Sequence, residues 1–298
     1  MRSAGFLTSS LLASVLLFGS ESARAREPEF CPAILGPFRE IVLAAEKPLD
    51  QVDLPSKVDL DFRRHDFARA YGMYVGYWKS SFDPGTLRAV IGKISDGRTP
   101  TPEDLLWLKT ERGKLKKLRN AYVAFGEKHD FTPYLDEMTT RIGHVQDGIN
   151  SGDVAFTRHE SARLENFFTS KVERKLAKEI DGFKPAKERN FRKWFASEVS
   201  ELRRGLQRKS LSPQEFHCSR KIVSRFVATF DALATLAPSA ENLRMTEYLG
   251  SLNEQMGIYH DSLVKQALEH EIDYSSDRIA FPVPIRAALD RLVTKLSE

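Results

Sequence analysis

The chain has few cysteines and lacks the short motifs that mark common enzymes and metal sites. Its 298 residues include two cysteines and 17 glycines. Two separated cysteines exclude zinc sites built from paired cysteines. The sequence also contains no Gly-x-Ser-x-Gly elbow, no phosphate-binding Gly-rich loop and no His-Glu-x-x-His. We therefore expect no catalytic residue, no metal site and no cofactor. A phosphate-ester or glycan enzyme is the less favoured alternative, and it requires a cleft with acid and base groups of shifted pKa.

Strand patterns and a strong excess of one charge are missing as well. No segment alternates apolar and polar residues, whereas from Pro37 onward nearly every segment repeats with a period close to that of an α-helix. Pro-, Gly- and Ser-rich breakers divide this region into nine or ten expected helices, several of them longer than 20 residues. The net charge of +4 gives no global reason to expect a polyanion partner, so such a partner must be argued from local clusters of charge. No specific nucleic-acid partner is expected. The fold class is predicted to be all-α, a helical bundle.

Long apolar runs are confined to the amino terminus. Arg2 precedes an uncharged, mostly apolar run over 4–19, and Ala23 and Ala25 form the small-x-small pattern of a signal-peptidase site. The run is shorter than the ~20 residues that a membrane-spanning helix needs. We expect a cleaved signal peptide over 1–25, no transmembrane segment in the mature protein, and a periplasmic or secreted location. An uncleaved amino-terminal anchor is the alternative.

The two cysteines are Cys31 and Cys218. Export would place them in an oxidising compartment, where a disulfide between them is possible. Cys218 also lies in a helical pattern, in which a small buried thiol is equally ordinary. Both interpretations are open at this point.

A 14-residue segment occurs twice in related form. "YLDEMTTRIGHVQD" (134–147) and "YLGSLNEQMGIYHD" (248–261) align without gaps. They share Tyr134/Tyr248, Leu135/Leu249, Gly143/Gly257 and Asp147/Asp261. A glycine inside a helix costs roughly 1 kcal/mol relative to alanine, so the two glycines predict a close approach between helices. We interpret the two aspartates as hydrogen-bond acceptors within the bundle rather than as catalytic acids.

Each of these segments follows a helix that carries a basic stripe. Lys109, Arg112, Lys116 and Arg119 recur at three, four and three residues, and His217, Lys221 and Arg225 recur at four, with Arg220 beside them. Like charges at this spacing destabilise an isolated helix. A bound polyanion would convert the repulsion into attraction. The alternative is a solvated face that pairs with acidic residues of neighbouring helices.

The starts and the cores of these two helices are also predictable. Thr101 and Ser212 are candidate N-caps, each followed by a proline at the first helical position. The expected core stripes are Leu108, Leu115, Leu118, Tyr122 and Phe125 in one helix, and Phe216, Ile222 or Val223, Phe226 and Phe230 in the other.

These motifs resemble the CHAD family, the conserved-histidine α-helical domain. "EFHCSRKIVSRF" (215–226) is similar to the family's His-x-x-Arg-Lys-x-x-x-Arg helix, and "LGSLNEQMGIYHD" (249–261) to its helix that ends in Gly-x-x-x-Asp. In the first half, "RGKLKKLRNAYVAF" (112–125) and "IGHVQD" (142–147) fit in outline, with Arg112 where the family has its histidine and Leu115 where Arg220 stands in the second copy.

The resemblance implies two pseudo-symmetric antiparallel helical bundles around a basic groove that binds inorganic polyphosphate without catalysis. The implied ligand residues are His217, Arg220, Lys221 and Arg225, with Arg112, Lys116 and Arg119 from the first copy, and the stripe adds Lys109. The expected division is a signal peptide (1–25), an N-terminal segment (26–58) and two bundle repeats (59–165 and 166–298).

We therefore expect an exported, non-enzymatic binding protein for polyphosphate or another polyanion, with His217 as a donor whose charge depends on pH. The alternative function is a helical scaffold or interaction protein of the cell envelope.

Overall fold

A computed structural model describes residues 32–298 of the chain, and this part is all-helical, as predicted. Its helices are α1 (Pro32–Leu43), the 3₁₀ helix η1 (Leu49–Gln51), α2 (Arg64–Lys79), α3 (Pro84–Ser95), α4 (Pro102–Phe125), α5 (Pro133–Ser151), α6 (Val154–Phe167), α7 (Ser170–Asp181), α8 (Glu188–Gln207), α9 (Pro213–Leu236), α10 (Ala240–Leu268) and α11 (Val283–Lys295). Within these residues there is no β-strand, and two isolated β-bridges join loop segments. The signal peptide expected over 1–25, and Cys31, lie outside the described residues.

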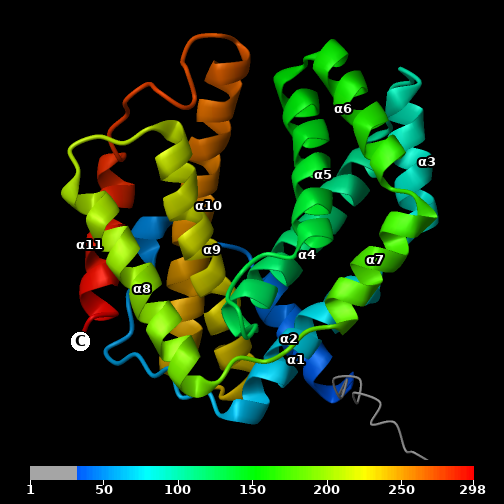
Figure 1. Cartoon of the computed structure of the whole chain (residues 1–298). Coiled ribbons are helices and arrows are strands. Elements are labelled where there is room, and N and C mark those ends of the chain that lie inside the picture. The colour runs from blue at the N-terminus through cyan, green and yellow to red at the C-terminus, as the bar shows by residue number, and fades with distance from the viewer. Residues whose placement is uncertain (1–31) are drawn as a thin grey trace, which may run out of the picture.

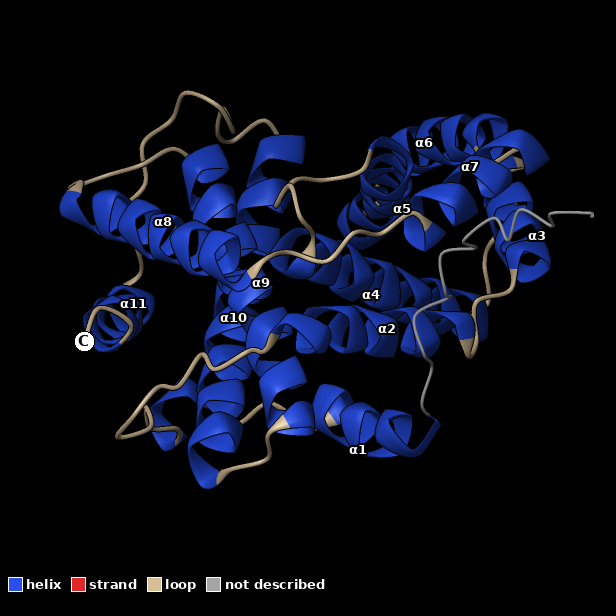
Figure 2. Cartoon of the chain, turned by 60° about the horizontal axis from the view of Figure 1, so that its bottom comes forward, coloured by secondary structure: helices blue, strands red, loops and turns tan. Residues whose placement is uncertain are grey.

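The helices form two groups that spread apart at one side of the molecule (Figure 1). One group contains α3, α5, α6 and α7, and the other contains α8, α9, α10 and α11. Helix α4 joins the two groups, because it packs against α5 of the first group and also against α9 of the second. In Figure 2, α4, α2 and α1 lie in successive rows, in agreement with the contacts that α2 makes with both neighbours. Helices α4, α5, α9 and α10 thus surround the space between the groups.

The boundary between the two helix groups differs from the expected division. We placed residues 166–298 in the second repeat, which would include α7. In the structure α7 packs against α5, a helix of the first group, and the chain enters the second group at α8. The sequence pattern does not show this, because an amphipathic helix such as α7 reveals which of its faces is apolar but not which helix covers that face.

The predicted starts of α4 and α9 are confirmed, and each is a capping box. The Thr101 hydroxyl accepts a hydrogen bond from the backbone N–H of Asp104, and the Asp104 carboxylate accepts one from the N–H of Thr101. Ser212 and Glu215 form the same reciprocal pair at the start of α9. Each cap stabilises its helix by about 1 kcal/mol. These local signals therefore position the first residue of both basic helices.

The core stripes predicted on these two helices are buried, apart from the half-buried Tyr122. The N-terminal segment also contributes to the core, since Phe38 of α1 is fully buried and its ring makes an edge contact with that of Tyr74 at 4.7 Å. Burying such a phenylalanine side chain contributes about 1.5 to 3 kcal/mol.

In residues 32–298, none of the helices combines the length and the apolar character needed to cross a bilayer.

Candidate functional site

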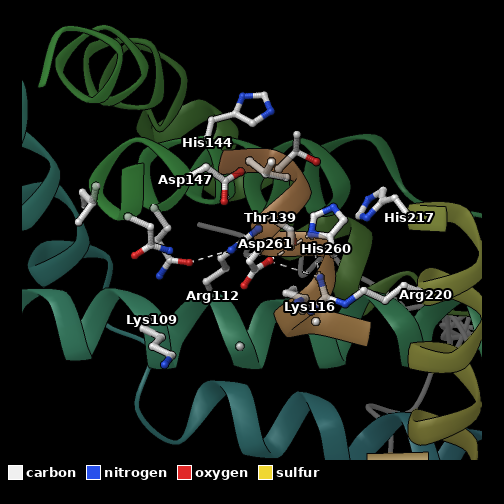
Figure 3. A pocket seen from close by; sticks show the side chains of 18 of the residues that line it. Lys109, Arg112, Lys116, Thr139, His144, Asp147, His217, Arg220, His260 and Asp261 are labelled. Carbon is white, nitrogen blue, oxygen red and sulfur yellow. Dashed lines mark hydrogen bonds and ion pairs between the residues drawn. The ribbon is translucent and has the colours of Figure 1, made fainter. Parts of the chain in front are cut away.

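A pocket of about 860 Å³ lies between α4, α5, α9 and α10. Basic side chains from two helices line it (Figure 3). They are Lys109, Arg112, Lys116 and Arg119 of α4, and His217, Arg220 and Lys221 of α9. The two basic stripes recognised in the sequence, apart from Arg225, therefore face one shared pocket between α4 and α9, which pack against each other.

Arg112 is held in the pocket by the first copy of the repeated segment. Its Nη1 donates a hydrogen bond to Oε1 of Gln146 at 2.9 Å. A Cβ atom added to Gly143 would lie 2.5 Å from Nη2 of Arg112, which is too close for any contact. The negative charge of Asp147, one turn after the glycine, partly offsets the lowering of the Arg112 pKa that burial causes. Gly143 thus makes room for the guanidinium, and Asp147 supplies a nearby countercharge.

Arg220 is held in the same way by the second copy. A Cβ atom on Gly257 would lie 2.8 Å from Nη2 of Arg220. Asp261 Oδ1 is 3.8 Å from Nη1 of Arg220, close enough for an ion pair. Burial lowers the pKa of Arg220, and the charge of Asp261 opposes this effect. The repeated Gly-x-x-x-Asp pattern therefore has a physical meaning, in which the glycine admits an arginine from the preceding helix and the aspartate faces its charge.

This geometry corrects two expectations from the sequence. The close approach at the glycines is made by an arginine side chain rather than by the backbone of a second helix. The sequence alignment matched Arg112 to His217, whereas the structure gives Arg112 and Arg220 the same contact with their glycines. A helix can shift along its axis by one turn, about 3.6 residues, and keep the same residues on one face, so the pattern alone did not fix this register.

Lys116 lies between the two arginines. Its side chain is half-buried, and among the described residues it has no hydrogen bond or ion pair. Burial holds its pKa well below the usual 10.5, and the positive charges of Arg220, Arg112 and Arg119 lower it further. An ammonium group in this position is unfavourable until an anion arrives.

Phe131 lies beside two of the cations that line the pocket. Arg119 is buried, and its Nη1 donates to Oδ1 of Asp136 at 2.8 Å. The cationic groups of Arg119 and Lys221 lie 5.3 and 5.9 Å from the centre of the Phe131 ring. Lys221 has no ion pair within residues 32–298, and burial, followed by the charge of Arg119, lowers its pKa. Phe131 thus brings two cations close together where only one of them has a carboxylate.

Two histidines stack beside Arg220. The rings of His217 and His260 are 4.4 Å apart and inclined by 30°. Burial, then the neighbouring His260 and Lys221, lower the pKa of His217 to about 2. Its Nδ1 is buried without a hydrogen-bond partner in the described part of the chain. His217 is therefore neutral at physiological pH, which corrects the expectation that its charge changes in that range.

Asp261 and Tyr274 determine the tautomer that we assign to His260. Its Nδ1 lies 3.1 Å from Oδ1 of Asp261 and 3.2 Å from Nη1 of Arg220. Asp261 requires a hydrogen-bond donor at Nδ1, whereas the Arg220 guanidinium requires an acceptor there, and Nδ1 of a neutral ring cannot be both. We assign the hydrogen to Nδ1, which donates to Asp261, so that Nε2 accepts from the hydroxyl of Tyr274 at 2.9 Å. Burial lowers the pKa of His260, and Arg220 contributes to the same effect.

Comparison of the chain with protein-family models, with curated proteins and with solved structures finds no match. The similarity to the CHAD family therefore rests on the quoted motifs.

Arg225 is a predicted site residue that lies outside the pocket. Its Nε donates to Oε2 of Glu198 on α8 at 2.7 Å, and its Nη2 contacts the same oxygen. Each step of four residues advances about 40° around a helix, so Arg225 lies about 80° from His217. This rotation turns Arg225 from the pocket toward α8. We therefore assign Arg225 a structural role.

The remaining predicted positions are placed as follows. Lys109 is exposed at the edge of the pocket and has no ion pair within residues 32–298. Two other segments rich in lysine and arginine, 184–194 and 202–209, do not line the pocket. Cys218 is solvent-exposed, and its suggested partner Cys31 lies outside the described residues, so their disulfide stays a prediction. Among residues 32–298, no three His, Cys, Asp or Glu side chains are grouped to hold a metal ion.

Several lining residues were not selected from the sequence. Glu254 and Tyr274 line the pocket, and Tyr274 belongs to the loop after α10. Asp147 and Asp261 were noticed as a repeat but interpreted as architecture. No local signal identifies Tyr274, because it reaches His260 only through the return of the loop between α10 and α11.

Proposed function

We propose that this chain is an exported, non-catalytic binding protein that holds a phosphate-rich anion, inorganic polyphosphate or a related oligophosphate, in the pocket between α4 and α9. Six lysine and arginine side chains line this pocket, against the three carboxylates Asp147, Glu254 and Asp261, which leaves an excess of three positive charges among these groups. A phosphate group accepts charge-assisted hydrogen bonds from several such donors at once. The proposal makes the chain a distant relative of the CHAD family.

The observation that carries this proposal is the lack of ion pairs at four of the cations. Lys109, Arg112, Lys116 and Lys221 have no carboxylate within 4.0 Å among the described residues. The scaffold alternative requires each basic side chain to face an acidic partner. Of the seven lysine and arginine residues predicted for the site, Arg119, Arg220 and Arg225 have such a partner within residues 32–298. Cations held together without partners are costly, and a bound anion would remove that cost.

Binding of tripolyphosphate to the purified protein tests the proposal. We expect measurable affinity by calorimetry at low salt, which decreases as the salt concentration rises because several charges engage the ligand. Lys116→Gln should weaken binding roughly tenfold, the effect of one charge-assisted contact.

Lys193→Gln is the matched control. It removes one positive charge from an exposed position on α8 that does not line the pocket. Its affinity should equal that of the unmodified protein. No binding at low salt, or equal losses in the two variants, contradicts the proposal.

A further inference from the structure

The pocket is not basic throughout, because apolar side chains also line it. The apolar lining residues are Leu105, Leu106 and Leu108 in the first two turns of α4, Ile149 near the end of α5, Phe156 near the start of α6, and Ile258, Val264, Ala267 and Leu268 in the second half of α10. The basic residues of α4 follow its apolar turns in the chain. The ends of α5 and α10 lie at the same side of the molecule, at the top of Figure 1. The pocket therefore has an apolar part, formed by these side chains, in addition to its basic part.

Two of these apolar side chains are unusually exposed. Leu106 is 66% exposed and Ile258 is 57% exposed, and they lie on different helices of the pocket. Scattered exposed apolar residues are ordinary, but exposed apolar groups gathered along a concave surface mark a binding site. Val264, Ala267 and Leu268 are half-buried and continue the apolar surface along α10.

An inorganic phosphate chain does not account for this surface. Phosphate oxygens are satisfied by the cations of α4 and α9, and they gain nothing from leucine and isoleucine side chains. A hydrocarbon attached to the phosphate would contact them and remove their surface from water. The pocket volume of about 860 Å³ lies within the range of pockets that bind small organic ligands, about 300 to 1,000 Å³.

We infer that the ligand is a phosphorylated amphiphile, a hydrocarbon chain that ends in a phosphate or diphosphate. Its phosphate lies among Arg112, Lys116 and Arg220, and its hydrocarbon chain lies along Leu106, Ile258 and Val264. This inference rests on the proposed function, since it assumes that the basic part of the pocket holds phosphate. It adds that the apolar part selects an organic phosphate over an inorganic one.

Calorimetry with three ligands separates the contributions of the two parts. Pyrophosphate carries the headgroup alone, farnesyl diphosphate carries the same headgroup with a hydrocarbon chain, and farnesol carries the chain alone. All are used at equal pH and salt, below the concentration at which the lipids aggregate. We expect farnesyl diphosphate to bind at least tenfold more tightly than pyrophosphate, with a more negative heat-capacity change. Farnesol should bind more weakly than farnesyl diphosphate.

Two variants on the same helix provide the matched comparison. Ile258→Asn should lower the affinity for farnesyl diphosphate severalfold and leave that for pyrophosphate unchanged. Leu243→Asn changes a side chain of α10 that is 44% exposed but does not line the pocket, and it should leave both affinities unchanged. Both positions are exposed, so neither variant is expected to disturb folding.

The outcomes distinguish this inference from the proposed function. Equal affinities for pyrophosphate and farnesyl diphosphate overturn the inference and leave the proposed function in place. No binding of either ligand at low salt overturns both. Equal losses of farnesyl diphosphate affinity in the two variants indicate adsorption to the general surface and overturn the inference. Binding of ATP as tight as that of farnesyl diphosphate also overturns it, because the adenine base is polar.

Discussion

Replacing Gly143 with alanine tests the role that the structure gives to the repeated glycine. The new Cβ atom would lie 2.5 Å from Nη2 and 3.0 Å from Cζ of Arg112, whereas ordinary contact begins at 3.4 Å. The Nη2 atom must therefore move by about 0.9 Å, which is the difference between 3.4 and 2.5 Å. A guanidinium at the end of a flexible side chain can make this movement. We expect the helix to stay intact while Arg112 is displaced.

The free energy of unfolding should change little. Alanine is favoured over glycine inside a helix by about 1 kcal/mol. Displacement of Arg112 weakens its 2.9 Å hydrogen bond to Gln146, and a typical hydrogen bond contributes about 1 kcal/mol. The two effects oppose each other, so the net change should be below about 1 kcal/mol.

The affinity for tripolyphosphate should change much more. A hydrogen bond to a charged group contributes about 1.5 to 3 kcal/mol, which corresponds to roughly a 10- to 100-fold loss. Urea denaturation measures the stability, and calorimetry measures the affinity. The control is Gly205→Ala on α8, where the nearest atom to the added Cβ is Ser219 Oγ at an ordinary 3.6 Å. It has the same helix preference without displacing a pocket residue.

Two results would refute this reasoning. Unchanged affinity in Gly143→Ala would show that Arg112 does not hold the anion. A loss of stability of several kcal/mol would show that Gly143 is needed for backbone packing and not for the guanidinium.

Three further predictions follow from the charges of the pocket and its surroundings. Lys116→Met should raise the free energy of unfolding by about 1 to 3 kcal/mol near neutral pH, because it removes a partly buried cation without a partner. The folded-state pKa of Lys116 lies below its unfolded value of 10.5, so the unmodified protein gains stability as the pH rises from the folded-state pKa toward 10.5. The stability advantage of the methionine variant should therefore shrink over this pH range. Urea titrations at two pH values measure the advantage, and a constant advantage contradicts the prediction. Tripolyphosphate binding should take up protons and tighten as the pH falls, since an anion raises the depressed pKa of Lys116. Calorimetry in two buffers of different ionisation enthalpy detects the uptake, and proton release would exclude it. Arg225→Met should leave the anion affinity unchanged. It should lower the free energy of unfolding by about 2 to 3 kcal/mol, because Glu198 then remains partly buried without its partner. A loss of affinity at unchanged stability would show that Arg225 belongs to the binding site.

The helical frame was largely predictable because its signals are local. A side-chain oxygen at Thr101 or Ser212 followed by proline determines where α4 and α9 begin, and the partners lie three residues away. Leu108, Leu115 and Leu118 share a face of α4 through helical geometry alone, and all three are buried. The assignment of α7 to the first group was not predictable, because its contact with α5 joins segments that are distant in the chain.

The site residues that share one face of a single helix could be predicted from the sequence. The spacing of Arg112, Lys116 and Arg119 placed them on a single face of α4, and the structure directs all three into the pocket. The same reasoning failed for Arg225, since steps of four residues rotate progressively around the helix and Glu198 of another helix captures its side chain.

The sequence by itself determined that the chain is helical, where its two basic helices begin, and that each precedes a Gly-x-x-x-Asp segment. Only the tertiary structure decided that both basic stripes face one pocket, that Gly143 and Gly257 admit arginine side chains, and that His217 is neutral. The physical reason is the range of the interactions. Caps and periodicity act within a few residues of the chain, whereas burial and Coulomb forces depend on groups from distant segments, such as His260 beside His217.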